Sequence, residues 1–302
     1  MHLAEFVAMA AIAARRATDL ITIAIVLALV AAAMHGTWNV IVKVSGDPTD
    51  TLTRATAAAA LLMTPPAFVA WLIAGRPGLS VEAAGLAGLS ALLELAYIFL
   101  LSAAYRRGEV SVVYPIARGS APLLAVLIGL GFLGERLAAP QLIGVGLLLA
   151  GILAVTLPQT SGRATVPALL TGVAIAAYTA VDRVGVRLAA PWLYGWLLVS
   201  LMATGLMVTQ SVRARLARST VKPGREAPPP VTWRQAVVVG LFMWVAYLLV
   251  LVALSIAPLS VVAPVRETAV VAVAVWGVWR LRERQGTAFK LSGAVKRASS
   301  KR

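Results

Sequence analysis

Apolar runs of roughly 20 residues, separated by short polar gaps, make up most of this 302-residue chain. A helical run of that length crosses a hydrocarbon layer of about 30 Å. Short gaps such as Arg106–Glu109 and Gly134–Ala139 make consecutive helices antiparallel neighbours. The pattern predicts an all-α, polytopic membrane protein with nine spans: Leu20–Val42, Leu52–Ala74, Val81–Ala104, Val110–Leu133, Pro140–Leu157, Val166–Leu188, Trp192–Val212, Ala236–Ile256 and Leu259–Trp279.

The fourth run carries two prolines and a lone arginine. Pro115 and Pro122 each remove the backbone hydrogen bond to the carbonyl four residues earlier. In lipid, such a carbonyl and the guanidinium of Arg118 are tolerable only where they face protein or a wet cavity. We therefore expect this helix to line an internal cavity.

The chain also contains a repeat. Ser111–Pro115 reads SVVYP, and Ser260–Pro264 reads SVVAP at an offset of 149; Ala96-Tyr97 likewise returns as Ala246-Tyr247. The first half of the chain contains five spans, which is an odd number, so the second half enters the membrane in the opposite sense. Inverted repeats are a recurring plan of secondary transporters, whose substrate sites lie near the midplane between the halves.

The two ends of the chain stand apart from the repeat. The apolar stretch Leu3–Ala14 precedes Arg15-Arg16, the reverse of the order in a cleavable signal peptide. We expect four regions: an N-terminal interfacial segment (1–19), a first repeat of five helices (20–157), a second repeat with four evident helices (164–284) and a basic tail (285–302). Anionic lipid headgroups, not nucleic acid, are the expected partner of that tail.

Composition narrows the function. Hydrophobic residues make up 60% of the chain and charged residues 13%, against roughly 25% charged in soluble proteins. There is no cysteine and there are two histidines, so the sequence offers neither thiol chemistry nor a His-rich metal site. It also lacks HExxH, GxSxG and nucleotide-binding GxxxxGK[ST] patterns. We predict a protein that is no enzyme and that uses no metal, cofactor or ATP.

The motifs resemble the drug/metabolite transporter superfamily, in particular its ten-helix EamA family. The resemblance is carried by HGTWN at His35–Asn39, by Ala103–Val126, by LGER at Leu133–Arg136 and by Gly144, Gly146 and Gly151. It implies two inverted five-helix repeats around a central cavity, and alternating-access transport of small metabolites. Within the family we favour bacterial amino-acid exporters of the YddG type, with aromatic or broad specificity. Such a protein would be a monomer of the cell inner membrane, with a small-molecule substrate and the bilayer as partners.

One part of the family pattern is absent. Leu281–Gln285 is followed by Phe289–Val295, which is too short for a tenth span. A non-transporting or partner-dependent membrane subunit is therefore an alternative. Loops after the odd-numbered spans carry 14 Lys and Arg, and the other side carries 6. This bias would place the N-terminus outside, whereas the resemblance implies inside; orientation, direction of transport and coupling ion stay open.

Buried charges and rings mark the expected site. Arg118 and Glu267 each lie three residues after the proline of their copy, so we expect them to pair across the repeat. Glu94 has no evident mate and is a candidate site or proton carrier, or a protonated structural carboxyl. Asp182-Arg183, near a helix end, is interpreted as interfacial. The predicted substrate-binding residues are His35, Trp38, Asn39, Glu94, Tyr97, Tyr114, Arg118, Tyr178, Trp244, Tyr247 and Glu267.

Small residues are assigned to packing. Glycine lets neighbouring helices approach closely in a membrane. We expect this role for Gly85, Gly88, Gly144, Gly146 and Gly151.

Overall fold

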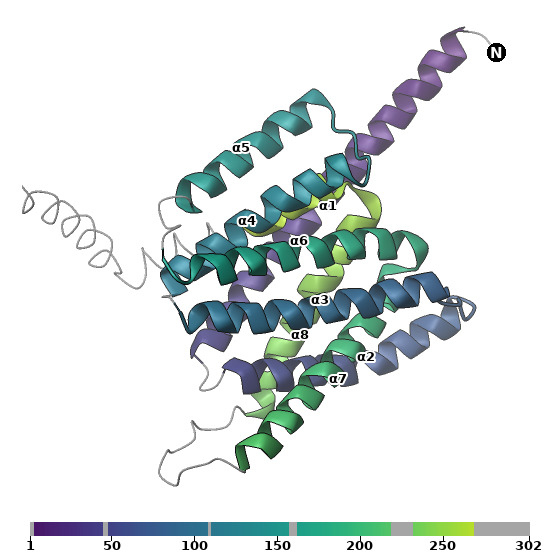
Figure 1. Ribbon diagram of the computed structural model, residues 1–302. Coiled ribbons are helices and arrows are strands. Elements are labelled where there is room, and N and C mark those ends of the chain that lie inside the picture. Colours follow the sequence, from purple (N-terminus) through teal and green to yellow (C-terminus); the bar gives the residue numbers. More distant parts are fainter. Residues whose placement is uncertain (1–2, 45–47, 108–109, 157–161, 219–231, 269–302) are drawn as a thin grey trace, which may run out of the picture.

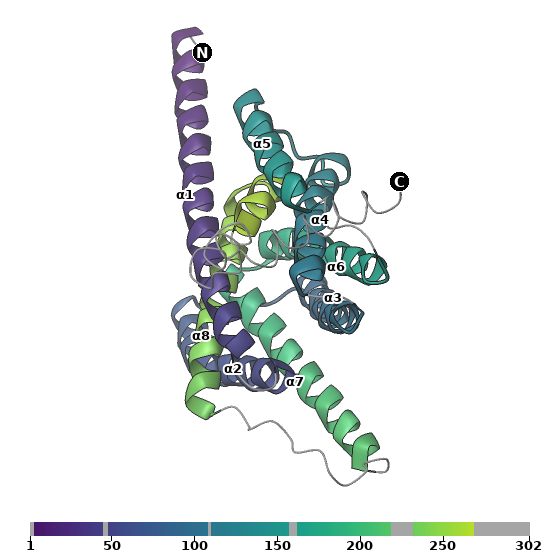
Figure 2. The ribbon, with the colours of Figure 1, turned by 90° about the vertical axis from the view of Figure 1, so that its left-hand side faces the viewer.

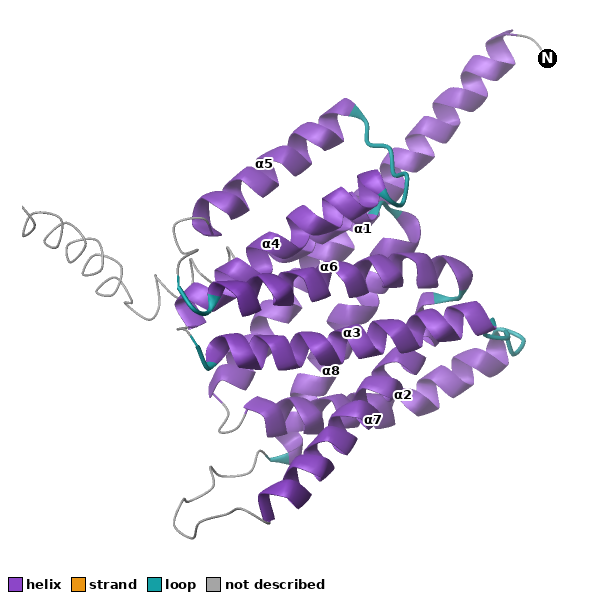
Figure 3. Ribbon diagram, in the orientation of Figure 1, coloured by secondary structure: helices purple, strands orange, loops and turns teal. Residues whose placement is uncertain are grey.

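The computed structural model describes residues 3–44, 48–107, 110–156, 162–218 and 232–268 (Figure 1). This part of the chain is helical and contains no strand (Figure 3). Residues 259–268 are also helical. The other helices are α1 (Leu3–Val44), α2 (Pro48–Ile73), α3 (Val81–Tyr105), α4 (Val110–Gly131), α5 (Ala139–Thr156), α6 (Thr165–Leu188), α7 (Pro191–Arg218) and α8 (Trp233–Ile256).

Six of the described helices are long and apolar enough to cross a membrane. They are α1, α2, α3, α6, α7 and α8; α4 and α5 contain shorter apolar stretches, Ile116–Gly131 and Ala139–Ala154. The expected all-α, polytopic fold is confirmed. The expected tenth-helix region lies outside the described residues.

The helix ends follow local sequence signals. Ser80 caps α3 by accepting from the backbone N–H of Ala83 at 3.1 Å. Thr232 and Gln235 form a reciprocal capping box at the start of α8. Gly134 lies in the turn after α4 with a positive φ of 64°, a conformation that glycine adopts without steric penalty. The start of α3 and the α4–α5 turn lie at one end of the bundle, and the start of α8 lies at the other end (Figure 3).

Five of the main helix contacts are related by a shift of five, although α6 and α7 also pack on α8 without comparable α1–α3 and α2–α3 contacts. α3 packs on α6, as α1 packs on α8; α2 packs on α8, as α7 packs on α3; and α2 packs on α7. Replacing each helix by the one five places away leaves this set of contacts unchanged. That is the pattern that a duplicated five-helix unit predicts. The bounds of the two repeats stay predictions.

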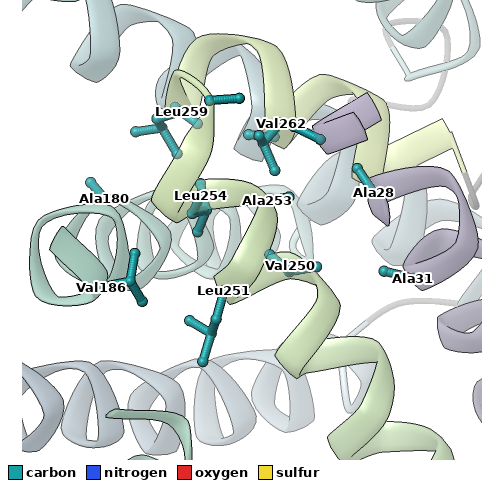
Figure 4. Packing of buried hydrophobic residues seen from close by; sticks show 14 of the residues in the cluster. Ala28, Ala31, Ala180, Val186, Val250, Leu251, Ala253, Leu254, Leu259 and Val262 are labelled. Atoms are coloured by element: carbon teal, nitrogen blue, oxygen red, sulfur yellow. The ribbon is translucent and has the colours of Figure 1, made fainter. Parts of the chain in front are cut away.

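The main core lies where α1, α6 and α8 meet the helix at 259–268. Figure 4 shows Leu254 and Leu259 at the bend after α8, facing Ala180 of α6, with Val262 beside Ala28 of α1. These side chains are all buried. Because four elements bury apolar surface at the bend, the core fixes the direction in which the second proline-bearing helix leaves it.

α1 is longer than a span. It runs unbroken for 42 residues, and its N-terminal part projects beyond the rest of the bundle (Figure 2). An interfacial position for residues 1–19 stays a prediction, and it requires a bend that the described helix does not contain.

The described residues do not support the assignment of Gly85, Gly88, Gly144, Gly146 and Gly151 to close packing. At all five, the place that a Cβ would occupy is open with respect to the described residues. The close approaches lie elsewhere, at Gly240 of α8 against the backbone of Ala55, and at Gly172, Gly185 and Gly205. The sequence shows which positions are small but not which of them face a neighbouring helix.

Candidate functional site

A cavity of about 240 Å³ lies inside the bundle, between residues of α1, α2, α3 and α4 and residues of α6, α7, α8 and 259–268. It extends from mid-bundle toward the end where α1 and α3 finish and α2 and α8 begin, which we call the α1–α2 face. The lining residues Leu52 of α2 and Ser102 of α3 lie close to those helix ends. Pockets for drug-sized ligands measure roughly 300–1,000 Å³, so this one suits a smaller solute.

Eight of the eleven expected site residues line this cavity: His35, Trp38, Glu94, Tyr97, Arg118, Tyr178, Trp244 and Tyr247. Glu267 is bonded to one of these, Arg118. The side chains of Asn39 and Tyr114 lie outside the described part of the structure. Arg266 also lines the cavity and was missed, because the repeat drew attention to its neighbour Glu267.

The expected pair of Arg118 and Glu267 forms at the inner wall. Arg118 Nη1 donates to Glu267 Oε1 at 3.1 Å and to Oε2 at 3.3 Å. Arg266 donates to the same Oε1 from Nη2 at 3.1 Å and from Nε at 3.2 Å. All three side chains are buried. Among the described residues, two guanidinium groups therefore share one carboxylate, so their positive charges outnumber its negative charge by one.

His35 extends this cluster to α1. Its Nε2 lies 2.6 Å from Arg118 Nη2, and a guanidinium can only donate. His35 Nε2 is then the acceptor, so the imidazole is neutral with its proton on Nδ1. The ring also meets Trp38 edge-on, with centroids 4.7 Å apart. Trp38 is thereby held next to the cationic cluster.

Two buried polar atoms of the cavity lining lack hydrogen-bond partners among the described residues. They are Glu94 Oε1, an acceptor, and Trp38 Nε1, a donor. A buried polar atom without a partner costs about 1–3 kcal/mol. A site that holds one of each can recover that cost when a polar solute supplies both a donor and an acceptor.

Asp182 is buried inside the bundle, so it does not face the solvent or lipid surface as an interfacial residue near a helix end would. It is 1% exposed, and Ser90 Oγ and Tyr194 Oη donate to Oδ1 at 2.6 and 3.0 Å. Tyr247, which lines the cavity, donates to Oδ2. Hydroxyls of three different helices thus converge on one α6 carboxylate. This cluster lies on the side of the cavity away from the α1–α2 face.

Beyond Asp182, a second polar cluster lies at the opposite end of the bundle, the α4–α5 face. Glu135, in the turn after α4, accepts from the backbone N–H groups of Leu259 at 2.7 Å and Ser260 at 2.9 Å, and from Ser260 Oγ at 2.7 Å. Arg183 Nε donates to it at 3.3 Å and also bonds the carbonyl of Leu254. One carboxylate thus caps the helix at 259–268 and joins it to α4 and α6.

The arrangement is a small, mostly apolar cavity with a basic wall, an acidic side chain and five aromatic rings. Polar clusters close it toward one face of the bundle. Such a cavity can bind and release a small solute. The described residues contain no group of three or more His, Cys, Asp or Glu side chains that could hold a metal ion.

Comparisons with known proteins agree with this geometry. Residues 22–157 match the EamA-like transporter family. One similar solved structure, described only as a crystal structure of a protein, has a TM-score of 0.58 and 19% identity, over 86% of this chain and 89% of its own. That likeness shows the fold alone. No curated protein matches the chain.

The family match covers the first half of the chain and supports the broad class. Members of that family are membrane transporters, a class that implies a small-molecule substrate and a lipid environment. With six helices able to span a membrane, the chain is a multi-pass membrane protein.

Proposed function

We propose that this protein is a secondary transporter of the inner membrane that exports amino acids or similar small metabolites. The observation that carries the proposal is the central cavity, which is lined from both halves of the chain and holds buried charges and rings. Its paired lining residues Tyr97 and Tyr247 occupy matching positions in the two copies of the repeat. A site built by both halves is what alternating access needs, because movement of one half against the other changes the face to which the site opens.

In this proposal the cavity is closed toward the α4–α5 face and opens there in the other state of alternating access. For a solute to leave there, the Glu135 cluster must release the helix at 259–268, and the hydroxyls around Asp182 must part. Both clusters join first-half to second-half residues, as in Glu135–Arg183 and Ser90–Asp182. They therefore hold together the surfaces that alternating access separates.

Two modes of energy coupling fit this site. Glu94 can exchange a proton in step with the solute, which makes transport respond to a pH gradient. Facilitated diffusion needs no such group. In either mode a monomer suffices, because the described cavity lining is complete within one polypeptide.

The test is flux in proteoliposomes that contain the purified full-length protein. Vesicles are loaded with each of the twenty standard amino acids in turn, and their efflux is followed by isotope release. Saturable efflux of at least one amino acid is the expected result. Wild-type flux that does not exceed that of empty vesicles for any of them would rule out this substrate class. A protein that purifies only with a second subunit would instead favour a partner-dependent role.

A further inference from the structure

We infer that the cavity selects solutes that carry a positive and a negative charge together, with Arg266, Arg118 and Trp38 receiving the anionic group and Glu94 the cationic group. This rests on the proposed transport function and names the chemistry by which its site tells solutes apart. It is argued from the charges and unpaired atoms of the lining.

The basic side of the cavity is set for an anion. Within the part of the chain that the structure describes, Arg118 and Arg266 form ion pairs with the same carboxylate, Glu267. Both arginines line the cavity, whereas Glu267 does not. Arg266 Nη2 reaches Tyr178 Oη at only 3.5 Å, so a carboxylate that entered would be a closer partner for it. Charge-assisted bonds from guanidinium to carboxylate are the strongest that such a site can offer.

Trp38 strengthens this side. Its buried Nε1–H has no partner among the described residues, and its ring is held against His35, which is itself bonded to Arg118. Trp38 thus contacts the residue that binds Arg118, and its indole N–H can add a neutral donor to the two guanidinium groups. A carboxylate has about four acceptor positions, enough for all these donors.

Glu94 offers the complementary group. It lines the cavity from α3, and its Oε1 is buried without a partner among the described residues. No described Lys or Arg lies within ion-pair distance of it. The nearby acid Asp182 differs, because Ser90 and two tyrosines already satisfy it. An ammonium group carries three donors and would supply both the charge and the hydrogen bond that Glu94 lacks.

The solute that meets both ends is a small zwitterion. An anion would leave Glu94 Oε1 buried without a partner, and a cation would leave Trp38 Nε1 without one and the two guanidinium groups with only their shared carboxylate. The site should therefore bind a singly charged solute more weakly than a zwitterion. A substrate that lacks a polar partner for a buried group loses more affinity than one that lacks a methylene. The apolar remainder of the lining, including Leu52, Met202 and Leu206, accommodates an apolar or aromatic side chain.

The experiment measures binding of labelled L-phenylalanine to the purified full-length protein, in competition with 3-phenylpropanoate, which lacks the ammonium, and 2-phenylethylamine, which lacks the carboxylate. We expect each analogue to compete at least about tenfold more weakly than L-phenylalanine. Glu94→Gln should bring 3-phenylpropanoate within about twofold of L-phenylalanine, and Arg266→Gln should do so for 2-phenylethylamine. Trp38→Phe, which removes only the N–H donor, should shift the 2-phenylethylamine ratio in the same direction.

Asp50→Asn and Arg54→Gln are matched controls, because they remove the same charges from an ion pair on α2 that lies outside the cavity. Both should keep the wild-type ratios. Equal competition by either analogue in the wild type, wild-type ratios in Glu94→Gln, or no saturable binding of L-phenylalanine would overturn the inference. Flux of another small metabolite through the same cavity would leave the transport function intact.

Discussion

Arg118 and Glu267 are 149 positions apart in the chain, yet Arg118 Nη1 lies 3.1 Å from Glu267 Oε1. Each follows the proline of its own repeat copy by three residues. The pair therefore joins equivalent points of the two proline-bearing helices. Arg266 shares the same carboxylate. Substitution of Glu267 and substitution of either arginine should therefore destabilise the protein to different extents.

Glu267→Gln should destabilise the protein more than Arg118→Gln. The first leaves two buried guanidinium groups without their shared carboxylate, and removing one partner of a buried pair costs about 3–5 kcal/mol. The second leaves Glu267 paired with Arg266, so its cost is smaller. Thermal unfolding in detergent, followed by tryptophan fluorescence, would measure both. Equal losses would show that Arg266 does not compensate.

Asp182 is predicted to act as a unit with its hydroxyl donors. Asp182→Asn should lower the free energy of unfolding by about 1–3 kcal/mol, because an amide cannot accept at both positions and leaves a donor unpaired. Tyr247→Phe alone should cost about 1 kcal/mol. In a double-mutant cycle the two losses should be less than additive. Full additivity would mean that Tyr247 and Asp182 stabilise the protein independently.

The Glu135 cluster should control access from the α4–α5 face. The chain has no cysteine, so Val250→Cys in the cavity lining gives a single reactive site. In oriented vesicles, a membrane-impermeant thiol reagent should label it faster from the α1–α2 face. Adding Glu135→Gln should raise labelling from the α4–α5 face several-fold, because charge-assisted bonds to Arg183 and to the helix start are weakened.

Glu82→Gln is the control for that experiment. Glu82 is an exposed carboxylate in the first turn of α3, at the same end of the bundle. It should leave the labelling ratio unchanged. A Glu135→Gln protein that labels like the wild type would show that another contact holds this face closed.

Two glycine-to-alanine substitutions should change the stability of the protein in opposite directions. Gly240→Ala places a methyl group against the backbone of Ala55, which cannot yield without separating α8 from α2. Overpacking of this kind costs about 1–3 kcal/mol. Gly144→Ala on α5 meets no described atom and should stabilise its helix by about 0.5–1 kcal/mol. Melting temperatures of the two variants give the comparison; a destabilising Gly144→Ala would indicate a neighbour on α5.

Proton coupling has its own signature at Glu94. If Glu94 carries the proton, wild-type efflux should increase with an imposed pH gradient, and Glu94→Gln should remove that increase while a flux remains. The charged groups that act on Glu94 are Asp182 and Arg266, so Asp182→Asn is the companion variant and should retain the increase. A wild-type flux that does not change with the pH gradient would favour facilitated diffusion.

The sequence predicted the helices and much of the cavity lining for a physical reason. A span needs an apolar run of fixed length, and residues that break such a run must face inward. Arg118, Glu94 and Tyr97 were found in this way, and the repeat offset supplied Glu267 as a partner.

Other features depend on which way a side chain points, and a single sequence does not encode this visibly. Asp182 lies close to a helix end, and its three donors come from three separate helices. Glu135 looked like a loop residue, and its bonds to Ser260 arise only when the two halves meet. Gly240 and Gly144 have the same composition signal and different surroundings. In each case the missing information is a contact between distant segments.

The 42 residues of α1 form one rod, about 63 Å long at 1.5 Å per residue, roughly twice the thickness of the hydrocarbon layer. A rigid rod that is anchored through half its length is a lever. A rocking of about 10° in the anchored half would sweep the free tip by about 5 Å. If the anchored half rocks during transport, any molecule bound to the amino end of α1 would be displaced with it.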